Sequence, residues 1–482
     1  MAVRRSVAFL AVTALLAGCG GGGGGGSSGA TATGGSPTTG TPTPTVAAGC
    51  TLRERQDWVA AQMREWYLFP DTLPTSLDPT PYGSVDTFLD ALTATARAQR
   101  KDRYFTYLTS IKEETAYYTS GSSAGFGWRL GLDSNTRLYV TEAFEGAPAL
   151  AAGIDRGAEI LAIGTSASNL RTVGSLYNAG GNALADALGP DTTGTTRSFQ
   201  IRDAAGTRTV SVAKTDFTLT PVSSRYGVQV IADGGQRYGY VNLRTFIDTA
   251  DPALRSAFAQ FRAQGITNII VDLRYNGGGL VRTAELMSNL LGANRNTSEV
   301  MSYTTFRSEK SAENSTTFFA PQPQSVAPTR VAFIGTGGTA SASEFVINAF
   351  IPYLHANAAL IGTNTYGKPV GQIALDRAAC DDRLRVIAFA LQNAARQGAY
   401  YDGLANTVEA SCRAADDLAY PMGDPREAST RSALDFLQGK SCTRIGASAS
   451  AEARALSAPV TRVALTPSGE MSTAQREVPG LF

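Results

Sequence analysis

Histidine is almost absent from this sequence: His355 is the one histidine in 482 residues. It stands in residues 351–357, which we predict to be the end of a helix and a loop, where a histidine side chain is usually solvated. An enzyme of the Ser-His-Asp type would have to use this histidine as its base. The shortage therefore argues against that class, and any serine nucleophile in this chain needs another base.

An excess of either charge is also missing. The 42 lysine and arginine residues stand against 41 aspartate and glutamate residues, a net charge of +1. Loss of Arg4 and Arg5 with a signal peptide would bring the net charge close to zero. Such a chain gives no electrostatic reason to expect a nucleic acid or an anionic membrane surface as a partner.

The apolar run at the start, residues 7–17, is too short to cross a bilayer as a helix. It follows two arginines and is typical of a signal peptide. The run ends in the letters LAGC at Cys19, which resemble a bacterial lipobox, in which the cysteine is acylated and becomes the new N-terminus. We therefore predict an exported protein that a lipid on Cys19 anchors to the cell envelope, facing the periplasm; cleavage without lipid is the alternative. Gly20 does not resemble an inner-membrane retention signal, which favours an outer membrane where the cell has one.

Residues 20–49 contain almost nothing that a core could bury, because Gly, Ser, Thr and Pro dominate them. This composition predicts a flexible tether rather than a fold. The remaining sequence divides by its pattern into a helical stretch (50–119), a glycine-rich stretch of short strands (120–216), an α/β stretch (217–445) and a tail (446–482).

Cysteine is scarce as well, with five residues. Apart from Cys19 they are Cys50, Cys380, Cys412 and Cys442, and none of them has a second cysteine or a histidine at metal-ligand spacing, so we expect no metal site. An even number in an exported protein predicts two disulfides. Three pairings are possible, and we favour a local Cys380–Cys412 bridge with Cys50–Cys442 joining the two ends of the folded region.

The three folded stretches differ in their apolar pattern. In residues 50–119, apolar positions such as Trp58, Met63 and Tyr67 recur near one face of a helix, which predicts a small N-terminal helical domain. In residues 217–445, short buried strands alternate with helices, which predicts a layered α/β core with a partly parallel sheet. We expect strands at 238–243, 266–273, 331–335 and 359–362, and helices at 252–264, 283–291 and 345–354.

Residues 120–216 resemble a PDZ domain. The resemblance rests on the run EGAPALAAGIDRGAEILAI at residues 145–163, with Gly125, Phe126, Gly127 and Trp128 ahead of it. PDZ domains bind a chain terminus as an added strand, and backbone N–H groups of a glycine loop take the carboxylate. The resemblance implies that these four residues bind a peptide tail; a small β domain with an unrelated role is the alternative.

Two segments carry residues that can perform chemistry. In GGTASASE, residues 337–344, Ser341 stands where a strand passes into an apolar helix, so backbone N–H groups at the helix start can bind an oxyanion. Ser341 and Glu344 also have the spacing of a capping box, and the two roles are compatible. In TYGKPVGQ, residues 365–372, Lys368 can act as a base only if burial disfavours its ammonium form. A surface lysine in a glycine loop is the alternative.

Together with DLRYNGGG at residues 272–279, these two motifs resemble the carboxyl-terminal processing, or tail-specific, serine peptidases in order and spacing. That family also has a helical N-terminal region and a PDZ domain, so the resemblance extends over residues 50–439. It implies an endopeptidase with Ser341 as nucleophile and Lys368 as general base, and with peptide substrates and no cofactor. It further implies that Gln372 holds the lysine amine, and that Ala342 N–H and Gly278 N–H form the oxyanion hole.

Two departures from the family pattern are visible. Pro369 stands where the family usually has glycine, and Ser341 and Lys368 are 27 positions apart, about two more than the family leads us to expect. The extra length falls in a helix-to-strand loop at residues 352–357, where insertions are tolerated. The sequence indicates no role for residues 379–412.

The function that we predict is cleavage of envelope proteins whose C-terminal tails dock on the PDZ domain. A catalytically silent lipoprotein that only binds partners is one alternative, although such a scaffold has no need of a lysine at position 368. Another is a different serine hydrolase, such as an esterase, but the sequence lacks the G-x-S-x-G elbow of that class.

Overall fold

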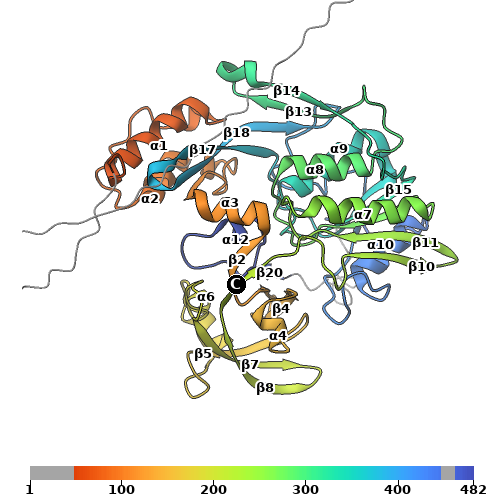
Figure 1. Cartoon of the computed structure of the whole chain (residues 1–482), viewed down its shortest axis with the longest axis horizontal. Coiled ribbons are helices and arrows are strands. Elements are labelled where there is room, and N and C mark those ends of the chain that lie inside the picture. Colours follow the sequence, from red (N-terminus) through yellow and green to blue (C-terminus); the bar gives the residue numbers. More distant parts are fainter. Residues whose placement is uncertain (1–47, 447–461) are drawn as a thin grey trace, which may run out of the picture. The chain divides into compact units, whose positions relative to one another are not determined.

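The computed structural model of the chain describes residues 48–446 and 462–482 (Figure 1). The predicted signal peptide, Cys19 and nearly all of the predicted tether lie outside the described residues. Within those two stretches, no helix is long and apolar enough to cross a membrane.

The N-terminal helices bury their apolar faces in a core that they share with a later β-hairpin. Met63, Tyr67 and Phe88 are fully buried, and they belong to one cluster with Val386 and Ile387 of that hairpin. The predicted helical domain therefore packs on a sheet and shares this core with it. Its elements are α1 (Leu52–Trp66), η1 (Pro70–Thr72), α2 (Val85–Ala98) and α3 (Ile111–Ser120).

The sheet beneath these helices is antiparallel, with strand order β1-β18-β13-β14 and β17 on β18. Strand β17 begins two residues after Lys368, so this sheet fixes one end of the lysine loop. The elements are β1 (Tyr107–Ser110), β13 (Val300–Phe306), η2 (Ser308–Glu313), β14 (Ser315–Phe318), β17 (Val370–Arg377), η4 (Ala378–Cys380) and β18 (Asp382–Gln392).

The core sheet has the order β10-β11-β12-β15-β16-β19, and every pair except β10–β11 is parallel. Alternate residues of its strands face opposite layers: Ile269 and Val271 pack with α7, α8 and α9, whereas Ile270 packs with α10. The predicted layered α/β core is thus present. Its elements are β10 (Val228–Asp233), β11 (Gln236–Asn242), α7 (Ala250–Ala263), β12 (Asn268–Asp272), α8 (Val281–Leu290), β15 (Arg330–Gly335), α9 (Ala342–Leu354), η3 (His355–Asn357), β16 (Ala358–Gly362), β19 (Ala410–Arg413) and α10 (Ala428–Leu437).

The stretch that resembles a PDZ domain, here called the PDZ-like domain (residues 120–216), forms its own sheet around a separate aromatic core. The Phe199 ring packs on Phe126 and Trp128, with ring centroids 5.1 and 4.9 Å apart. Strand order is β3-β4-β5-β7-β8, with β6 on β5, while β2 and β9 pair separately. The elements are β2 (Ser122–Gly125), β3 (Trp128–Leu132), β4 (Leu138–Ala143), α4 (Pro148–Ala151), β5 (Glu159–Gly164), β6 (Arg171–Thr172), α5 (Val173–Asn178), α6 (Ala183–Asp186), β7 (Thr196–Asp203), β8 (Gly206–Ala213) and β9 (Thr215–Thr218).

Residues 462–482, here called the returning segment, are part of the folded structure although the pattern predicts only a tail. Strand β20 (Val463–Ala464) adds to the free edge of β3, and helix α12 (Thr473–Glu477) packs on α3 (Figure 1). Ala474, Val478 and Leu481 share a core cluster with aromatic residues of α3. The segment therefore contacts both the PDZ-like domain and the N-terminal region.

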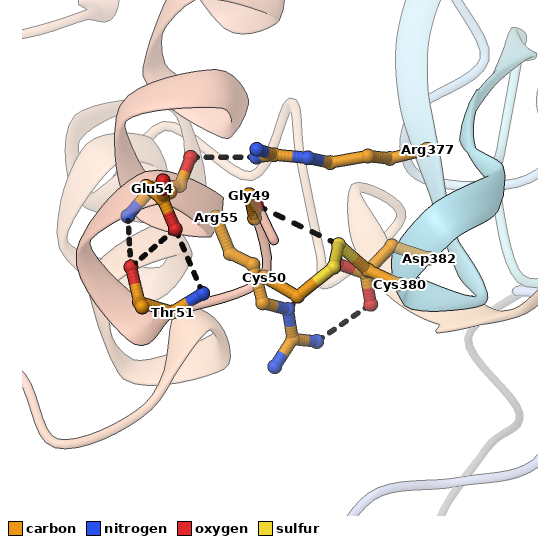
Figure 2. Close-up of a disulfide and its surroundings, with 8 residues drawn as sticks. All are labelled: Gly49, Cys50, Thr51, Glu54, Arg55, Arg377, Cys380 and Asp382. Carbon is orange, nitrogen blue, oxygen red and sulfur yellow. Dashed lines mark hydrogen bonds and ion pairs between the residues drawn. A yellow bond between two sulfur atoms is a disulfide. The ribbon is translucent and has the colours of Figure 1, made fainter. Parts of the chain in front are cut away.

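The predicted disulfide pairing is wrong. The bridges are Cys50–Cys380 and Cys412–Cys442, with Cα atoms 5.5 and 5.4 Å apart. Figure 2 shows the reason for the first: the turn η4 between β17 and β18 reaches the start of α1, where Arg55 also binds Asp382 over 2.6 Å. Because that hairpin lies over α1, Cys380 meets Cys50 across 330 residues of sequence.

Candidate active site

Ser341 lies at the junction of β15 and α9, at the carboxyl end of the parallel strands. Its φ of 53° and ψ of −114° form a backbone conformation that L-residues rarely adopt. The neighbouring residues are held firmly, because Ala340 N–H and the Ser343 hydroxyl both donate to the Asn276 carbonyl over 3.0 Å. Strained backbone persists only where its surroundings enforce it, and it concentrates at functional sites.

The triple-glycine loop lies directly against Ser341. A β-carbon added to Gly278 would come within 2.8 Å of the Ser341 Cβ, so only glycine fits there. The buried side chain of Asn276 shapes this loop: its amide donates to the Leu243 carbonyl over 2.8 Å, and its Oδ1 accepts from Gly278 N–H over 3.0 Å. Asn276 therefore connects the glycine loop with the serine loop.

The two predicted oxyanion donors border the same space but differ in their present partners. Ala342 N–H, at the first residue of α9, has no acceptor among residues 48–446 and 462–482. Gly278 N–H is already donated to Asn276. A β-carbon built on Gly278 would lie 3.3 Å from the Ala342 nitrogen. The site thus offers one free donor, and Gly278 must leave its present acceptor to supply a second.

Lys368 lies in the loop between β16 and β17 and is half-buried. Its Nζ donates to Gln372 Oε1 over 3.0 Å, and the Gln372 amide donates to the Phe105 carbonyl. The Phe105 ring centroid is 5.0 Å from Nζ. Burial lowers the pKa of the Lys368 amine, although the Glu477 carboxylate acts in the opposite direction. Such a lysine is more often neutral, and so able to accept a proton, than a solvated one.

One buried carboxylate joins the serine loop to the lysine loop. Glu344 Oε2 accepts from Ser341 N–H over 3.0 Å and from Lys368 N–H over 2.7 Å. Its Oε1 accepts from Gly367 N–H over 2.7 Å and from the Thr365 hydroxyl over 2.6 Å. The spacing of Ser341 and Glu344 indicates a helix cap, but no pattern in the sequence indicates that the same side chain binds the lysine loop.

A second buried carboxylate, that of Glu477, reaches the site from the returning segment. Its Oε1 accepts from the Tyr118 hydroxyl over 3.1 Å, and its Oε2 is 3.2 Å from a β-carbon built on Gly278. Burial raises the pKa of Glu477, and the nearby Lys368 amine lowers it. Ser341 and Lys368 form no side-chain hydrogen bond with each other in the described part of the chain. No motif of the sequence indicates Glu477.

A cavity of about 800 Å³ leads to this group of residues, a volume typical of ligand sites. Its walls come from the N-terminal region, the loops at the end of the core sheet, strand β3 and the returning segment. The residues that line it include Phe105, Ala340, Tyr366, Lys368, Met471 and Glu477.

The residues predicted to bind a peptide tail contact the chain itself. Gly127 N–H and Trp128 N–H donate to the Phe482 carbonyl oxygen over 2.9 and 3.3 Å. A β-carbon built on Gly125 would lie 2.8 Å from the Phe482 carbonyl carbon. The side chains of Phe126 and Trp128 lie in the core of the PDZ-like domain, in one cluster with Phe482.

His355 lies at the end of α9, as the sequence predicts, and its side chain is 64 % exposed. Its Nδ1 is 2.7 Å from Glu409 Oε1, on the protein surface.

In the described ranges, no group of three or more His, Cys, Asp or Glu side chains is placed to hold a metal ion.

Comparison with known proteins places these loops in a family. Residues 237–395 match the model of Peptidase family S41, and residues 54–107 match that of the Peptidase S41 N-terminal domain. Carboxyl-terminal-processing peptidase 3, chloroplastic, from Arabidopsis thaliana is 29 % identical over 271 residues, which cover 55 % of this chain and 49 % of the relative. A carboxyl-terminal-processing protease of Picosynechococcus is 29 % identical over 253 residues, 52 % of this chain and 55 % of the relative. The chain thus spans about half the length of the curated relatives that it matches.

The fold has a counterpart among solved structures. The crystal structure of a protein from Bacteroides fragilis, assigned as an S41 protease, superposes with a TM-score of 0.62 at 22 % identity, covering 79 % of this chain and 97 % of that one. The chain therefore contains two stretches, one after the other along its sequence, that match domains of peptidase family S41, a family of serine-type peptidases.

Proposed function

We propose that this chain is a serine endopeptidase with Ser341 as nucleophile and Lys368 as general base. The observation that carries the proposal is the buried Glu344 carboxylate, one oxygen of which binds both the serine loop and the lysine loop. A protein that only binds partners has no need to bury a lysine amine beside such a serine. The match of residues 237–395 to the model of Peptidase family S41 supports the same assignment.

In the proposed first step, the neutral Lys368 amine accepts the proton of the Ser341 hydroxyl while the serine oxygen attacks the substrate carbonyl. Gln372 orients the amine by accepting its hydrogen bond. The oxyanion binds Ala342 N–H, and also Gly278 N–H once that group has left its present acceptor. The Lys368 ammonium then protonates the leaving amine, and water hydrolyses the acyl-enzyme through the same base.

The substrates that we propose are envelope proteins recognised by their C-terminal tails. The names of the relatives, carboxyl-terminal-processing peptidases, support this class of substrate. The PDZ-like domain has a glycine loop and a strand, β3, whose edge opposite β4 pairs, within the described residues, only with the returning segment. Peptide recognition by strand addition needs such a loop and such an edge. The chemistry uses only groups of the chain, so zinc chelators should leave the activity unchanged.

We also propose export and anchoring through a lipid on Cys19. The two disulfides support an oxidising compartment. Replacement of Cys19 by serine should move the protein from the membrane fraction to the soluble one. A variant that still sediments with membranes would show that something other than this lipid holds it there.

The test of the proposed function is cleavage of an unfolded protein with an apolar C-terminal tail, followed by mass spectrometry of the products. We expect internal cleavage by the unaltered protein and none by the Ser341→Ala variant. Equal product formation by the two proteins would exclude Ser341 as the nucleophile.

A further inference from the structure

The free edge of strand β3 is covered by the chain's own returning segment. Leu130 N–H donates to the Gly480 carbonyl over 2.8 Å, and Phe482 N–H donates to the Trp128 carbonyl over 3.1 Å. Leu481 stands opposite Arg129 in an antiparallel bridge. Residues 480–482 therefore pair with β3 as an added strand, the arrangement in which PDZ domains bind peptides.

The side chain of Phe482 fills the place that an added peptide offers its last apolar residue. It is 3 % exposed and packs in one cluster with Phe126, Trp128 and Phe199. Its carbonyl oxygen accepts the two N–H groups of the glycine loop, from Gly127 and Trp128. The edge of β3, the glycine loop and this apolar pocket are here called the groove, and the groove is occupied.

The same segment also reaches the active site, a few residues earlier in the sequence. Gly277 N–H, in the triple-glycine loop, donates to the Glu477 carbonyl over 2.9 Å. The Gln475 amide donates to Asp191 of the PDZ-like domain over 2.5 Å. Between the groove and the site lie only Val478 and Pro479, so the two contacts cannot move independently over more than a short distance.

We propose that residues 472–482 are an intramolecular ligand of the groove, and that while bound they hold Glu477 beside Lys368 and the triple-glycine loop and restrain the enzyme. This inference rests on the proposed peptidase function. A substrate tail that enters the groove must displace residues 480–482. Their departure draws Glu477 away from the site, because only Val478 and Pro479 separate the two. Tail binding and release of the active site are thereby one event.

The charges around Lys368 support the proposal that Glu477 restrains the enzyme. Around Lys368 lie the carboxylates of Glu477 and Asp102 and the guanidinium groups of Arg385 and Arg476. Glu477 is the strongest of the groups that favour the ammonium form, and an ammonium cannot accept the serine proton. Glu477 is also the carboxylate that departs when the segment leaves.

Binding to the groove can be measured without catalysis, in protein that carries Ser341→Ala. The probe is a fluorescent peptide with the sequence VPGLF, residues 478–482, behind a Gly-Ser spacer. Because an intramolecular ligand competes at high effective concentration, we expect at least tenfold tighter peptide binding after Phe482→Asp in the protein. Phe318→Asp, at an exposed phenylalanine of β14, is the matched control and should change nothing. Equal affinity of the Phe482→Asp protein and its parent would overturn the inference.

Thermal melting would reveal whether Phe482→Asp unfolds the PDZ-like domain. If it does, hydrogen exchange of the Ser341→Ala protein tests instead whether the peptide displaces residues 472–482. Saturating VPGLF peptide should speed exchange across residues 472–482 while β3 stays protected. Unchanged exchange of residues 472–482 with the peptide bound would refute displacement. Neither measurement needs peptidase activity, so failure of the proposed function is distinguished from failure of this inference.

The Glu477→Gln variant of the active protein tests whether Glu477 lowers the rate of cleavage. Without the carboxylate the ammonium form of Lys368 is less favoured, so the acid limb of the pH–rate profile should move to lower pH and the rate near neutrality should rise. Glu313→Gln, an exposed glutamate at the end of η2, is the control and should move neither. A lower rate with an unmoved acid limb would mean that Glu477 supports the site, and would overturn the restraint.

Discussion

Single residues of the site are constrained from several sides at once. Ser341 has a positive φ, and Ala340 before it and Ser343 after it both donate to the Asn276 carbonyl. Gly278 faces the Ser341 β-carbon so closely that no side chain fits. Removal of one oxygen from Ser341 disturbs none of these contacts, whereas one added carbon at Gly278 disturbs the site itself. The two positions should therefore respond differently to alanine.

Ser341→Ala should abolish cleavage and leave the fold intact. The change removes one hydroxyl at a helix start, so the free energy of unfolding should fall by no more than about 1 kcal/mol. Product formation and denaturant unfolding of the same preparation measure the two effects. Turnover at the parent rate in this variant would contradict the assignment.

Gly278→Ala should lower the rate by roughly 100-fold or more, because the new carbon displaces Ser341 or the oxyanion donors. The φ of +129° at Gly278 adds backbone strain that alanine tolerates poorly. Gly83→Ala, where a β-carbon would meet nothing within 4 Å, is the matched control. Parent activity in Gly278→Ala would place the oxyanion hole elsewhere.

At the scale of elements, the site is built from the loops that follow three neighbouring parallel strands, β12, β15 and β16. The sequence predicts these strands well, because each is a short apolar run that ends at glycine or at a polar residue. The motifs that follow them could therefore be placed at one edge of the sheet before the structure was known. The sequence does not predict the hairpin of β17 and β18 or the returning segment, since their positions depend on partners far away in the chain.

The contact of Glu344 with the lysine loop is likewise not predictable from the sequence. Its spacing from Ser341 is local and predicts a cap, whereas its bonds to Thr365, Gly367 and Lys368 depend on β16 lying next to β15. A pattern of single residues carries no sign of that adjacency.

Glu344→Gln should separate the two loops. The amide nitrogen of glutamine would face backbone N–H groups in place of a carboxylate oxygen, leaving at least one buried donor unpaired, at a cost of about 1–3 kcal/mol. We expect a lower melting temperature and a lower rate at all pH values. An unchanged rate would show that the Ser341 and Lys368 loops need no common acceptor.

At the scale of the whole molecule, the bridge between Cys50 and Cys380 joins the first helix to a late hairpin. Spacing along the chain does not separate a local Cys380–Cys412 pair from a local Cys412–Cys442 pair, because the three cysteines follow one another at similar intervals. The correct pairing follows only from the position of the hairpin over α1, which sequence periodicity does not contain. The other bridge, Cys412–Cys442, joins β19 to the chain after α10.

Peptide mapping without reduction should recover these two pairs from exported protein. Cys380→Ser should lower the free energy of unfolding by roughly 2–5 kcal/mol, because the bridge closes a very long loop. Linked peptides containing Cys380 and Cys412, or four free thiols, would contradict the structure.

The central claim is that a lysine with a lowered pKa acts as the base, and the pH–rate profile tests it most directly. The base must be neutral, so kcat/KM should rise with pH through one limb whose midpoint lies below 10.5, the ordinary value for lysine. In Lys368→Arg the guanidinium stays protonated at every accessible pH, so no activity should appear anywhere in the profile. We expect that rising limb in the unaltered protein and no activity in Lys368→Arg. Cleavage by the arginine variant, or a profile that does not rise with pH, would contradict Lys368 as the base.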